Sequence, residues 1–145
     1  MDDPPSWQKV INPRGRDKDD EEKDLLFTLN PNAKGSARFG GTLSWHASEG
    51  IDAEHTDGKI AAEVVKQLEA NKDKPFFLAC GFFRPHTPYV APKKYFEMYP
   101  HEKLKLAEVP EKHRDSGPAA AFGSAKPEQA KLTDELRQKA LQAYY

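Results

Sequence analysis

The amino-acid sequence predicts a protein of the α/β class. Two neighbouring segments carry this prediction: residues 56–71 repeat apolar side chains with the period of a helix, and residues 76–83 form an unbroken apolar run. Because the run does not alternate with polar residues, it predicts a strand buried on both faces, as in a parallel sheet covered by helices. A helix followed by a buried strand is half of a βαβ unit, and the strand before the helix is either residues 25–29 or lies outside the chain.

The composition is that of a polar chain with one apolar centre. Its 145 residues are enough for one domain or for part of a larger one. Charged residues make up 31% and hydrophobic residues 37%, and most of the aromatic side chains fall between residues 76 and 99. We therefore expect an ordered centre over residues 56–99 and weakly packed segments on both sides of it.

Charge and hydropathy exclude several classes of protein. The net charge is -1 at pH 7, which gives no basic surface for nucleic acid. No apolar run approaches the roughly 20 residues of a membrane span. Cys80 is the single cysteine, so the chain can form no intrachain disulfide. No pattern indicates the oligomeric state.

The first 55 residues are predicted to be mostly loop. Residues 14–24 are a run of charged side chains, which we interpret as a solvated segment. Residues 25–29 fit a short strand that ends at an Asn-Pro-Asn turn signal. Residues 33–50 carry four of the nine glycines and are predicted to be loop.

The helix over residues 56–71 is the clearest local pattern. Thr56 can cap its N-terminus, and Asp57 suits the positive end of the helix dipole. Pro75 stands where the helix has ended and the apolar run begins. The apolar stripe of the helix consists of Ile60, Ala61, Val64, Val65 and Leu68.

Beyond the apolar run, the sequence predicts two helices separated by a long loop. Residues 92–99 fit a short helix with Pro in its first turn. Residues 100–132 contain four prolines and little periodicity, which predicts an extended loop. A last helix begins at Thr133 and has no C-cap, so residues 133–145 are expected to be the start of a truncated helix. We therefore interpret the chain as cut short at this end.

The loop after the apolar run carries the side chains best suited to chemistry. Arg84 and His86 follow the predicted strand directly, and ligands bind outside the carboxyl ends of strands in open α/β sheets. A guanidinium matches phosphate or sulfate, and an imidazole can donate a proton to a leaving oxygen. Pro85 and Pro88 stiffen the loop. The competing interpretation is structural, with His86 bonded to a backbone carbonyl and Arg84 as a surface charge.

Two other groups of residues have side chains that could form a site. Cys80 precedes Arg84 by four residues, but in a strand this spacing is roughly 13 Å, too far for the arginine to assist a thiolate. We therefore expect Cys80 to pack as a small hydrophobe. Before the first long helix, a cluster of acids and a histidine could bind a cation, although the helix N-terminus explains the acids without one, so no metal ligands are predicted. The cluster is Asp52, Glu54, His55 and Asp57.

Several stretches together resemble the sulfatase family. The specific block runs from Lys74-Pro75-Phe76-Phe77-Leu78 to Arg84-Pro85-His86-Thr87-Pro88-Tyr89, and Thr56-Asp57-Gly58 with its helix precedes it. The resemblance covers nearly the whole chain and is closest to iduronate-2-sulfatase-like bacterial enzymes of the planctomycete type. The supporting stretches are Asp3–Trp7, Asn12–Gly15, Pro92–Phe96 and Gln142–Tyr145.

The resemblance implies an alkaline-phosphatase-like α/β fold that hydrolyses sulfate esters of carbohydrates. This chain would be an incomplete segment of that catalytic domain, with a helix, a buried parallel strand, long loops and a C-terminal helix. In the family, the nucleophile is a formylglycine made from Cys or Ser in a C/S-x-P-x-R motif, and acidic residues hold a calcium ion. The histidine at the position of His86 contacts the sulfate and assists the leaving oxygen, and Arg84 is carried over as a substrate-binding rim residue. Members of the family are usually exported.

The sequence departs from the family pattern at the nucleophile and the metal. Cys80 has Phe82 where the motif requires proline, and the paired aspartates and the later Asp-Asn or Asp-His pair of the metal site are absent. The nucleophile and the calcium ligands are therefore expected outside the chain, which alone should be inactive. Two alternatives stay open: a non-catalytic module that binds an anion or sugar, and a segment of another phosphoesterase of the alkaline-phosphatase superfamily.

Overall fold

The computed structural model of the chain describes residues 4–145. Residues 1–3, which open the segment predicted to be loop, lie outside the described residues. The helices and strands are α1 (Arg16–Glu22), β1 (Phe27–Thr28), α2 (Ser36–Phe39), β2 (Ser44–Ser48), α3 (Thr56–Asn71), β3 (Tyr89–Pro92), α4 (Lys93–Met98) and α5 (Asp134–Tyr144). Short 3₁₀ helices occur at Pro4–Ser6, Asp52–Glu54, His101–Lys103, His113–Ser116, Ala119–Phe122 and Pro127–Lys131.

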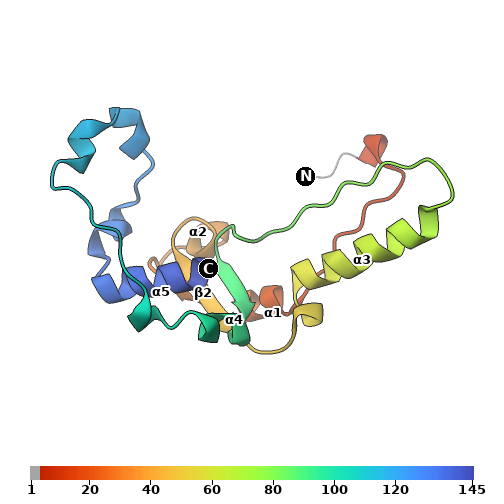
Figure 1. Ribbon diagram of the computed structural model, residues 1–145, viewed down its shortest axis with the longest axis horizontal. Coiled ribbons are helices and arrows are strands. Elements are labelled where there is room, and N and C mark those ends of the chain that lie inside the picture. The colour runs from red at the N-terminus through yellow and green to blue at the C-terminus, as the bar shows by residue number, and fades with distance from the viewer. Residues whose placement is uncertain (1–3) are drawn as a thin grey trace.

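The strands form one small mixed sheet in the order β1–β2–β3. β1 is antiparallel to β2 with Phe27 opposite Trp45, and the centroids of these two rings are 4.3 Å apart. β2 and β3 are parallel, with Trp45 opposite Tyr89 and Ser48 opposite Pro92. Since α3 lies between the two parallel strands in the chain, β2, α3 and β3 form a βαβ unit (Figure 1). The α/β class predicted from the sequence is confirmed.

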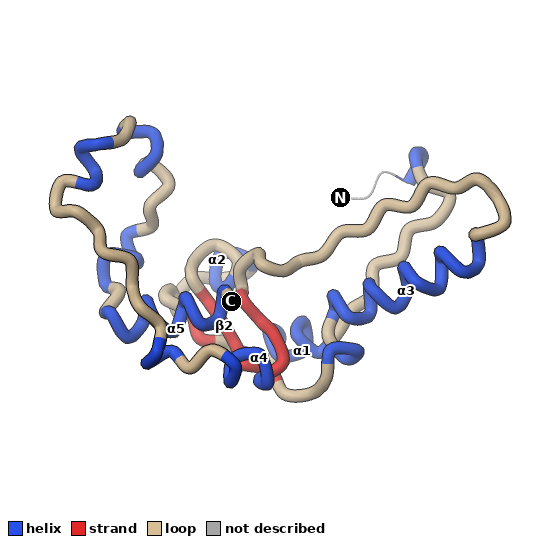
Figure 2. The backbone as a smooth tube through the Cα atoms, in the orientation of Figure 1, coloured by secondary structure: helices blue, strands red, loops and turns tan. Residues whose placement is uncertain are grey.

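Residues 76–83 are the main correction to the predicted fold, because they form no strand. They run back along α3 as an extended loop: the amide of Lys74 bonds to the carbonyl of Asn71, and the amide of Phe83 bonds to Asp57 (Figure 2). Phe77 is 81% exposed, and Cys80, predicted to be packed, is exposed as well. A strand requires a neighbour for its backbone hydrogen bonds, and no strand of residues 4–145 pairs with this segment.

Two segments predicted to be loop contain regular structure. The charged run includes α1, whose Asp17 and Asp20 side chains are buried rather than solvated. Residues 33–50 contain α2 and the central strand β2. The partners of the buried aspartates explain the difference, because Asp20 accepts a short hydrogen bond from Ser48 and Asp17 accepts one from Thr56 at 2.6 Å. These partners lie 28 and 39 residues away, beyond the reach of a local pattern.

The helices predicted from periodicity and caps are present. α3 covers residues 56–71, although His55 is its N-cap and Thr56 is its first helical residue. α4 lies within residues 92–99, and α5 begins where Thr133 caps it by accepting a 3.2 Å hydrogen bond from the amide of Leu136. The apolar stripe of α3 is only partly covered, since Val65 is 55% exposed.

The apolar core is small and lies beside the sheet. Leu26, Phe39 and Val90 form its buried cluster, each with less than a tenth of its surface exposed. More polar than apolar side chains are buried among the described residues, which indicates that hydrogen bonds and ion pairs rather than a large core hold the elements together. The buried polar residues are Asp17, Asp20, Thr42, Ser44, Ser48, His55 and Thr56.

The sheet occupies the middle of an elongated molecule. α3 and the extended residues 75–83 project to one side of it, and the loop over residues 104–132 projects to the other (Figure 1). α5 returns to the sheet, where the rings of Tyr144 and Tyr89 meet edge to face at 5.7 Å. Within residues 4–145, none of the helices has the length and apolar character needed to cross a membrane.

Candidate functional site

The loop Arg84–Pro88 joins the extended residues 75–83 to β3. It begins with a turn in which the amide of His86 donates a 2.9 Å hydrogen bond to the carbonyl of Phe83. The sequence predicted that this loop lies at the carboxyl end of a strand. That prediction is wrong, because residues 76–83 form no strand. The loop lies at the amino end of β3. Arg84 and His86 nevertheless share this one loop, with different surroundings.

Arg84 is mostly buried and is bonded inside the chain. Its side chain is 22% exposed, and Nη2 lies 3.2 Å from Oδ2 of Asp17. Nε donates to the carbonyl of Val90 at 3.0 Å, and Nη1 donates to the carbonyl of His86 at 3.4 Å. Burial lowers the pKa of Arg84, against the opposing charges of Asp17 and Asp57. The guanidinium remains charged because its ordinary pKa is above about 12, and two of its five N–H groups are left to donate.

His86 is exposed, and one side of its ring is bonded. Nδ1 lies 2.6 Å from the carbonyl oxygen of Thr87. A carbonyl only accepts, so Nδ1 carries the hydrogen and the neutral ring presents Nε2 as an acceptor. When the ring is protonated, Nε2 becomes a donor that faces outward. The bond to Thr87 is of the kind that a structural histidine makes, yet it leaves Nε2 without a partner among residues 4–145.

Asp57 attaches the loop to the start of α3. Its Oδ1 accepts the amide of Phe83 at 2.9 Å, and its Oδ2 accepts the amide of Arg84 at 3.0 Å. The sequence indicated Asp57 as an acid suited to the helix dipole and as a member of the acidic cluster, but gave no contact with the loop. These two bonds show a second role, in which one carboxylate holds two consecutive amides of the loop.

Asp17, in α1, also binds the start of α3. Oδ1 accepts from the amide of Thr56 at 2.7 Å and from its hydroxyl at 2.6 Å, while Oδ2 receives Arg84. Burial raises the pKa of Asp17, but the hydrogen bonds from Thr56 and the charge of Arg84 outweigh it, so the pKa lies below its ordinary value. Gly15 allows the close approach, because a Cβ there would stand 2.1 Å from the backbone nitrogen of Thr56.

The side chains of the acidic cluster before α3 are bonded within the chain. Asp52 pairs with Lys94 at 2.6 Å, and Glu54 accepts the amide of Ile51 at 3.1 Å. His55 is buried, with Nε2 3.4 Å from the carbonyl of Glu49. No group of three or more His, Cys, Asp or Glu side chains in the described part of the chain is placed to hold a metal ion. These side chains instead bond to Lys94 of α4 and to backbone groups of the turn before α3.

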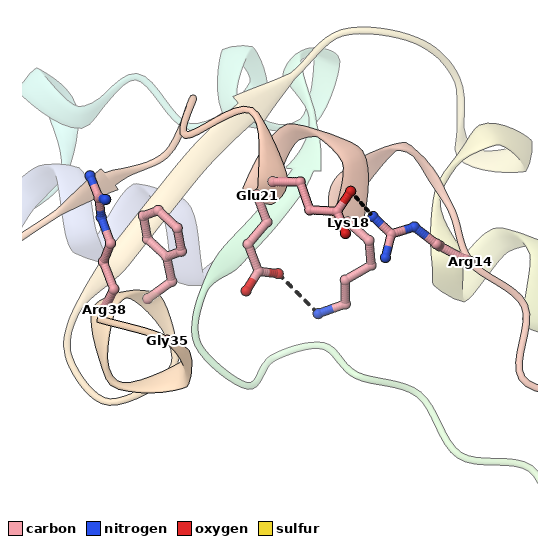
Figure 3. A pocket seen from close by; sticks show the side chains of 7 residues that line it. Arg14, Lys18, Glu21, Gly35 and Arg38 are labelled. Carbon is pink, nitrogen blue, oxygen red and sulfur yellow. Dashed lines mark hydrogen bonds and ion pairs between the residues drawn. The ribbon is translucent and has the colours of Figure 1, made fainter. Parts of the chain in front are cut away.

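The larger surface cavity, of about 370 Å³, is separate from Arg84 and His86. Its cations are paired inside the chain, with Lys18 3.1 Å from Glu21, as Figure 3 shows, and with Arg38 2.7 Å from Asp24. It therefore presents mixed, largely neutralised charge. The residues that line it are Arg14, Lys18, Glu21, Glu22, Gly35, Arg38 and Phe39.

A smaller cavity of about 160 Å³ adjoins the loop. It is lined by Arg84 and Pro85, by residues of β3 and α4, and by the last residues of the chain. Tyrosines contribute to its lining, and the pKa of Tyr89 is raised because burial disfavours the phenolate and Tyr144 lies beside it. The tyrosines at the cavity are Tyr89, Tyr95, Tyr144 and Tyr145.

Sequence reasoning identified Arg84 and His86 but missed the residues that hold them. Asp17 stands in a charged run that gives no sign of a buried partner, and Asp57 is explained by the helix dipole alone. No local pattern marks either contact, because Asp17 and Asp57 bond to segments that are distant in the chain.

Comparison with known proteins finds partial matches to sulfatases and to one related protein. No protein-family model matches the chain. The chain is 35% identical over 80 residues to a sulfatase of Formosa agariphila, which covers 54% of the chain and 15% of that protein. It is 39% identical over 69 residues to the iduronate 2-sulfatase of Mus musculus, covering 46% of the chain and 12% of that protein. It is also 38% identical over 55 residues to the multifunctional alkaline phosphatase superfamily protein PehA of Trinickia caryophylli, covering 37% of the chain and 11% of that protein.

The mixed α/β fold and the similarity to PehA fit the alkaline phosphatase superfamily. Named relatives within it are sulfatases, so the similarity over these partial regions supports a fragment of the sulfatase family, in agreement with the resemblance seen in the sequence. The matched regions span only 11–15% of the length of these three relatives.

Proposed function

We propose that this chain is part of an iduronate-2-sulfatase-like sulfuric ester hydrolase that acts on sulfated carbohydrate, and that His86 contacts the sulfate. The observation that supports this most directly is the state of the His86 ring. Its Nδ1 is bonded to the carbonyl of Thr87, and its exposed ring, on a loop held at Phe83 and Arg84, has no hydrogen bond to Nε2 from within residues 4–145. The similarity to named sulfatases supports the choice of ester.

The proposed role of His86 is to bind sulfate and assist the leaving group. In the protonated ring, Nε2–H donates to a sulfate oxygen or to the oxygen that links sulfur to the sugar. As a nucleophile from outside residues 1–145 bonds to the sulfur, the bond between sulfur and the sugar oxygen breaks, and the proton on Nε2 passes to that oxygen and leaves His86 neutral. The bond between Nδ1 and Thr87 keeps the ring in the orientation that this transfer needs.

Arg84 is proposed as a second contact to the substrate at the rim. Three of its N–H groups already donate inside the chain, so sulfate would use the two that remain. The cavity of about 160 Å³ that Arg84 and four tyrosines line would bind the sugar ring of the substrate, since it combines aromatic surface with few polar groups.

The nucleophile and the calcium ion of the family do not fit the described residues. No metal-binding group is present among them, and the exposed Cys80 lies on the extended segment rather than beside His86 in a C-x-P-x-R motif. We propose that both lie in sequence outside residues 1–145. The chain alone is therefore expected to hydrolyse no 4-nitrophenyl sulfate, and turnover that co-purifies with it would contradict this assignment.

One alternative has an observation in its favour. The similarity to PehA allows a segment of a different ester hydrolase of the same superfamily. Phosphate and sulfate share their tetrahedral shape, so His86 and Arg84 could receive either anion. Preference between the two anions separates the two functions.

The test is a titration of the chain followed by NMR of the histidine rings. Sodium sulfate, sodium phosphate and sodium chloride are added at matched ionic strength, and the His86 signals are identified by their loss in His86→Gln. We expect saturable shifts of His86 with sulfate and smaller ones with phosphate, while chloride produces none. His113→Gln is the matched control, because His113 lies in the separate 3₁₀ helix His113–Ser116 and contacts Phe122.

Each outcome of the titration decides between functions. A stronger response to phosphate than to sulfate favours the phosphoesterase alternative. A response of His86 equal to that of the other histidines overturns its role as a sulfate contact. Sulfate binding that persists in His86→Gln would place the anion elsewhere on the chain and would also overturn the role.

A further inference from the structure

We infer that Asp57 is a positioning residue, which fixes the loop that presents His86 by clamping two consecutive amides with one carboxylate. The inference rests on the proposed function for the role of His86 as a sulfate contact, whereas the clamp itself consists of two hydrogen bonds in the structure. Oδ1 of Asp57 is 2.9 Å from the amide nitrogen of Phe83, and Oδ2 is 3.0 Å from that of Arg84. Hydrogen bonds to an ionised carboxylate are about twice as strong as neutral ones.

The clamp holds the loop directly after a segment that no sheet holds in place. Residues 76–83 precede it and have no strand partner among residues 4–145, so no sheet sets their position. The amide of His86 bonds to the carbonyl of Phe83, the residue whose own amide Asp57 holds. Displacement of Phe83 would therefore carry His86 with it.

A second support reaches the same end of α3. The guanidinium of Arg84 pairs with Asp17, and Asp17 is bonded to the amide and the hydroxyl of Thr56. Thr56 and Asp57 are the first two residues of α3. The backbone of Arg84 is thus bonded directly to the first turn of α3, and its side chain is bonded to the same turn through Asp17. The position of this turn therefore sets the position of the loop that carries His86.

Asp57 could instead serve only the dipole of α3, and the two roles predict different effects of substitution. Loss of a dipole contribution alone would weaken the first turn of α3 and leave the loop as it is. Loss of the clamp would release the Phe83 and Arg84 amides and leave the middle of α3 intact. Asp57→Asn separates the cases further, because an amide side chain offers one acceptor oxygen and can retain only one of the two bonds.

The experiment measures amide hydrogen exchange by NMR in the chain and in Asp57→Ala, Asp57→Asn and Asp57→Glu. We expect Asp57→Ala to speed exchange at Phe83 and Arg84 by about tenfold or more, since each bond to a charged group is worth at least that factor. Asp57→Asn should lose protection at one of the two amides, and Asp57→Glu should restore part of it. Exchange at Val64, in the middle of α3, should not change.

The matched control is Asp52→Ala. Asp52 is an acid just before the same helix, but it is exposed and pairs with Lys94 rather than with the loop. We expect it to leave exchange at Phe83 and Arg84 unchanged. The second readout is the sulfate-induced shift of His86, which should saturate at about tenfold higher sulfate in Asp57→Ala and at the original concentration in Asp52→Ala.

The two levels of inference fail separately. Unchanged protection at both amides in Asp57→Ala overturns the clamp, as does equal loosening of the loop and of Val64. Lost protection with an unaltered sulfate response shows that the clamp does not position His86, and it overturns the inference. Lost protection in a chain whose His86 never responds to sulfate supports the clamp and overturns the proposed function instead.

Discussion

Arg84 and Asp17 form a largely buried ion pair between residues 67 positions apart, with 3.2 Å between Nη2 and Oδ2. Asp17 is 4% exposed at its side chain, and it also accepts two hydrogen bonds from Thr56. The pair joins α1, the start of α3 and the loop that carries His86. With only three residues in the buried apolar cluster, these polar contacts carry an unusual share of the stability.

Replacement of Asp17 by Asn should destabilise the chain by about 3 kcal/mol, because it leaves the Arg84 charge buried without its counterion. The measurement is urea denaturation followed by far-UV circular dichroism. Asp17→Asn combined with Arg84→Met should be less destabilised than the sum of the single variants. The control is Asp52→Asn at the exposed Lys94 pair, where the loss should not exceed about 1 kcal/mol. Equal effects at the two aspartates would show that the Asp17 pair is solvated in solution.

The stability should fall in acid through Asp17. Its pKa is lower in the folded chain than in the unfolded chain, so the unfolded state binds more protons at low pH. The contribution is complete above the ordinary aspartate value of about 3.9 and is lost as pH falls below it. The free energy of unfolding should therefore decline more steeply between about pH 5 and pH 3 in the native chain than in Asp17→Asn. Parallel curves for the two proteins would refute a contribution from this residue.

The sequence predicted the elements that are determined locally. α3, α4 and α5 follow from periodicity, a proline and the Thr133 cap, all of which act within one or two helical turns. Residues 76–83 were misassigned because an apolar run shows that a segment favours burial but does not show whether a neighbouring strand exists. α1 was missed because its buried aspartates depend on Ser48 and Thr56, which are distant in the chain.

The same distinction holds at the candidate site. Arg84 and His86 could be chosen from residue type and from their place after the apolar run. Their surroundings could not, because the guanidinium is held by Asp17 and the loop amides by Asp57, and both are contacts between distant segments. The structure therefore adds Asp17 and Asp57 as the residues that hold Arg84 and the loop amides, and the roles predicted for Arg84 and His86 stay predictions.

Phe77 should contribute little to stability although it belongs to the most apolar part of the chain. It is 81% exposed and its main contact is a stacked ring pair with Trp7 at 5.8 Å. Phe77→Ser should change the free energy of unfolding by less than about 1 kcal/mol and reduce binding of a hydrophobic dye. Phe39→Ala, in the buried cluster, should cost about 3 kcal/mol. Comparable losses at the two positions would mean that residues 76–83 are packed in solution.

Cys80 gives an independent test of the same segment, because it is the single cysteine and every labelled thiol reports on it. A buried strand would protect the thiol until the chain opened, whereas the exposed loop leaves it accessible at all times. We expect a thiol-reactive reagent to label the native chain at nearly the rate measured in urea. Cys80→Ser provides the blank for the reagent. Labelling slower than in urea by tenfold or more would support the buried strand that the sequence predicted for residues 76–83. Such a strand would require a partner strand from another molecule, since no strand of residues 4–145 pairs with this segment.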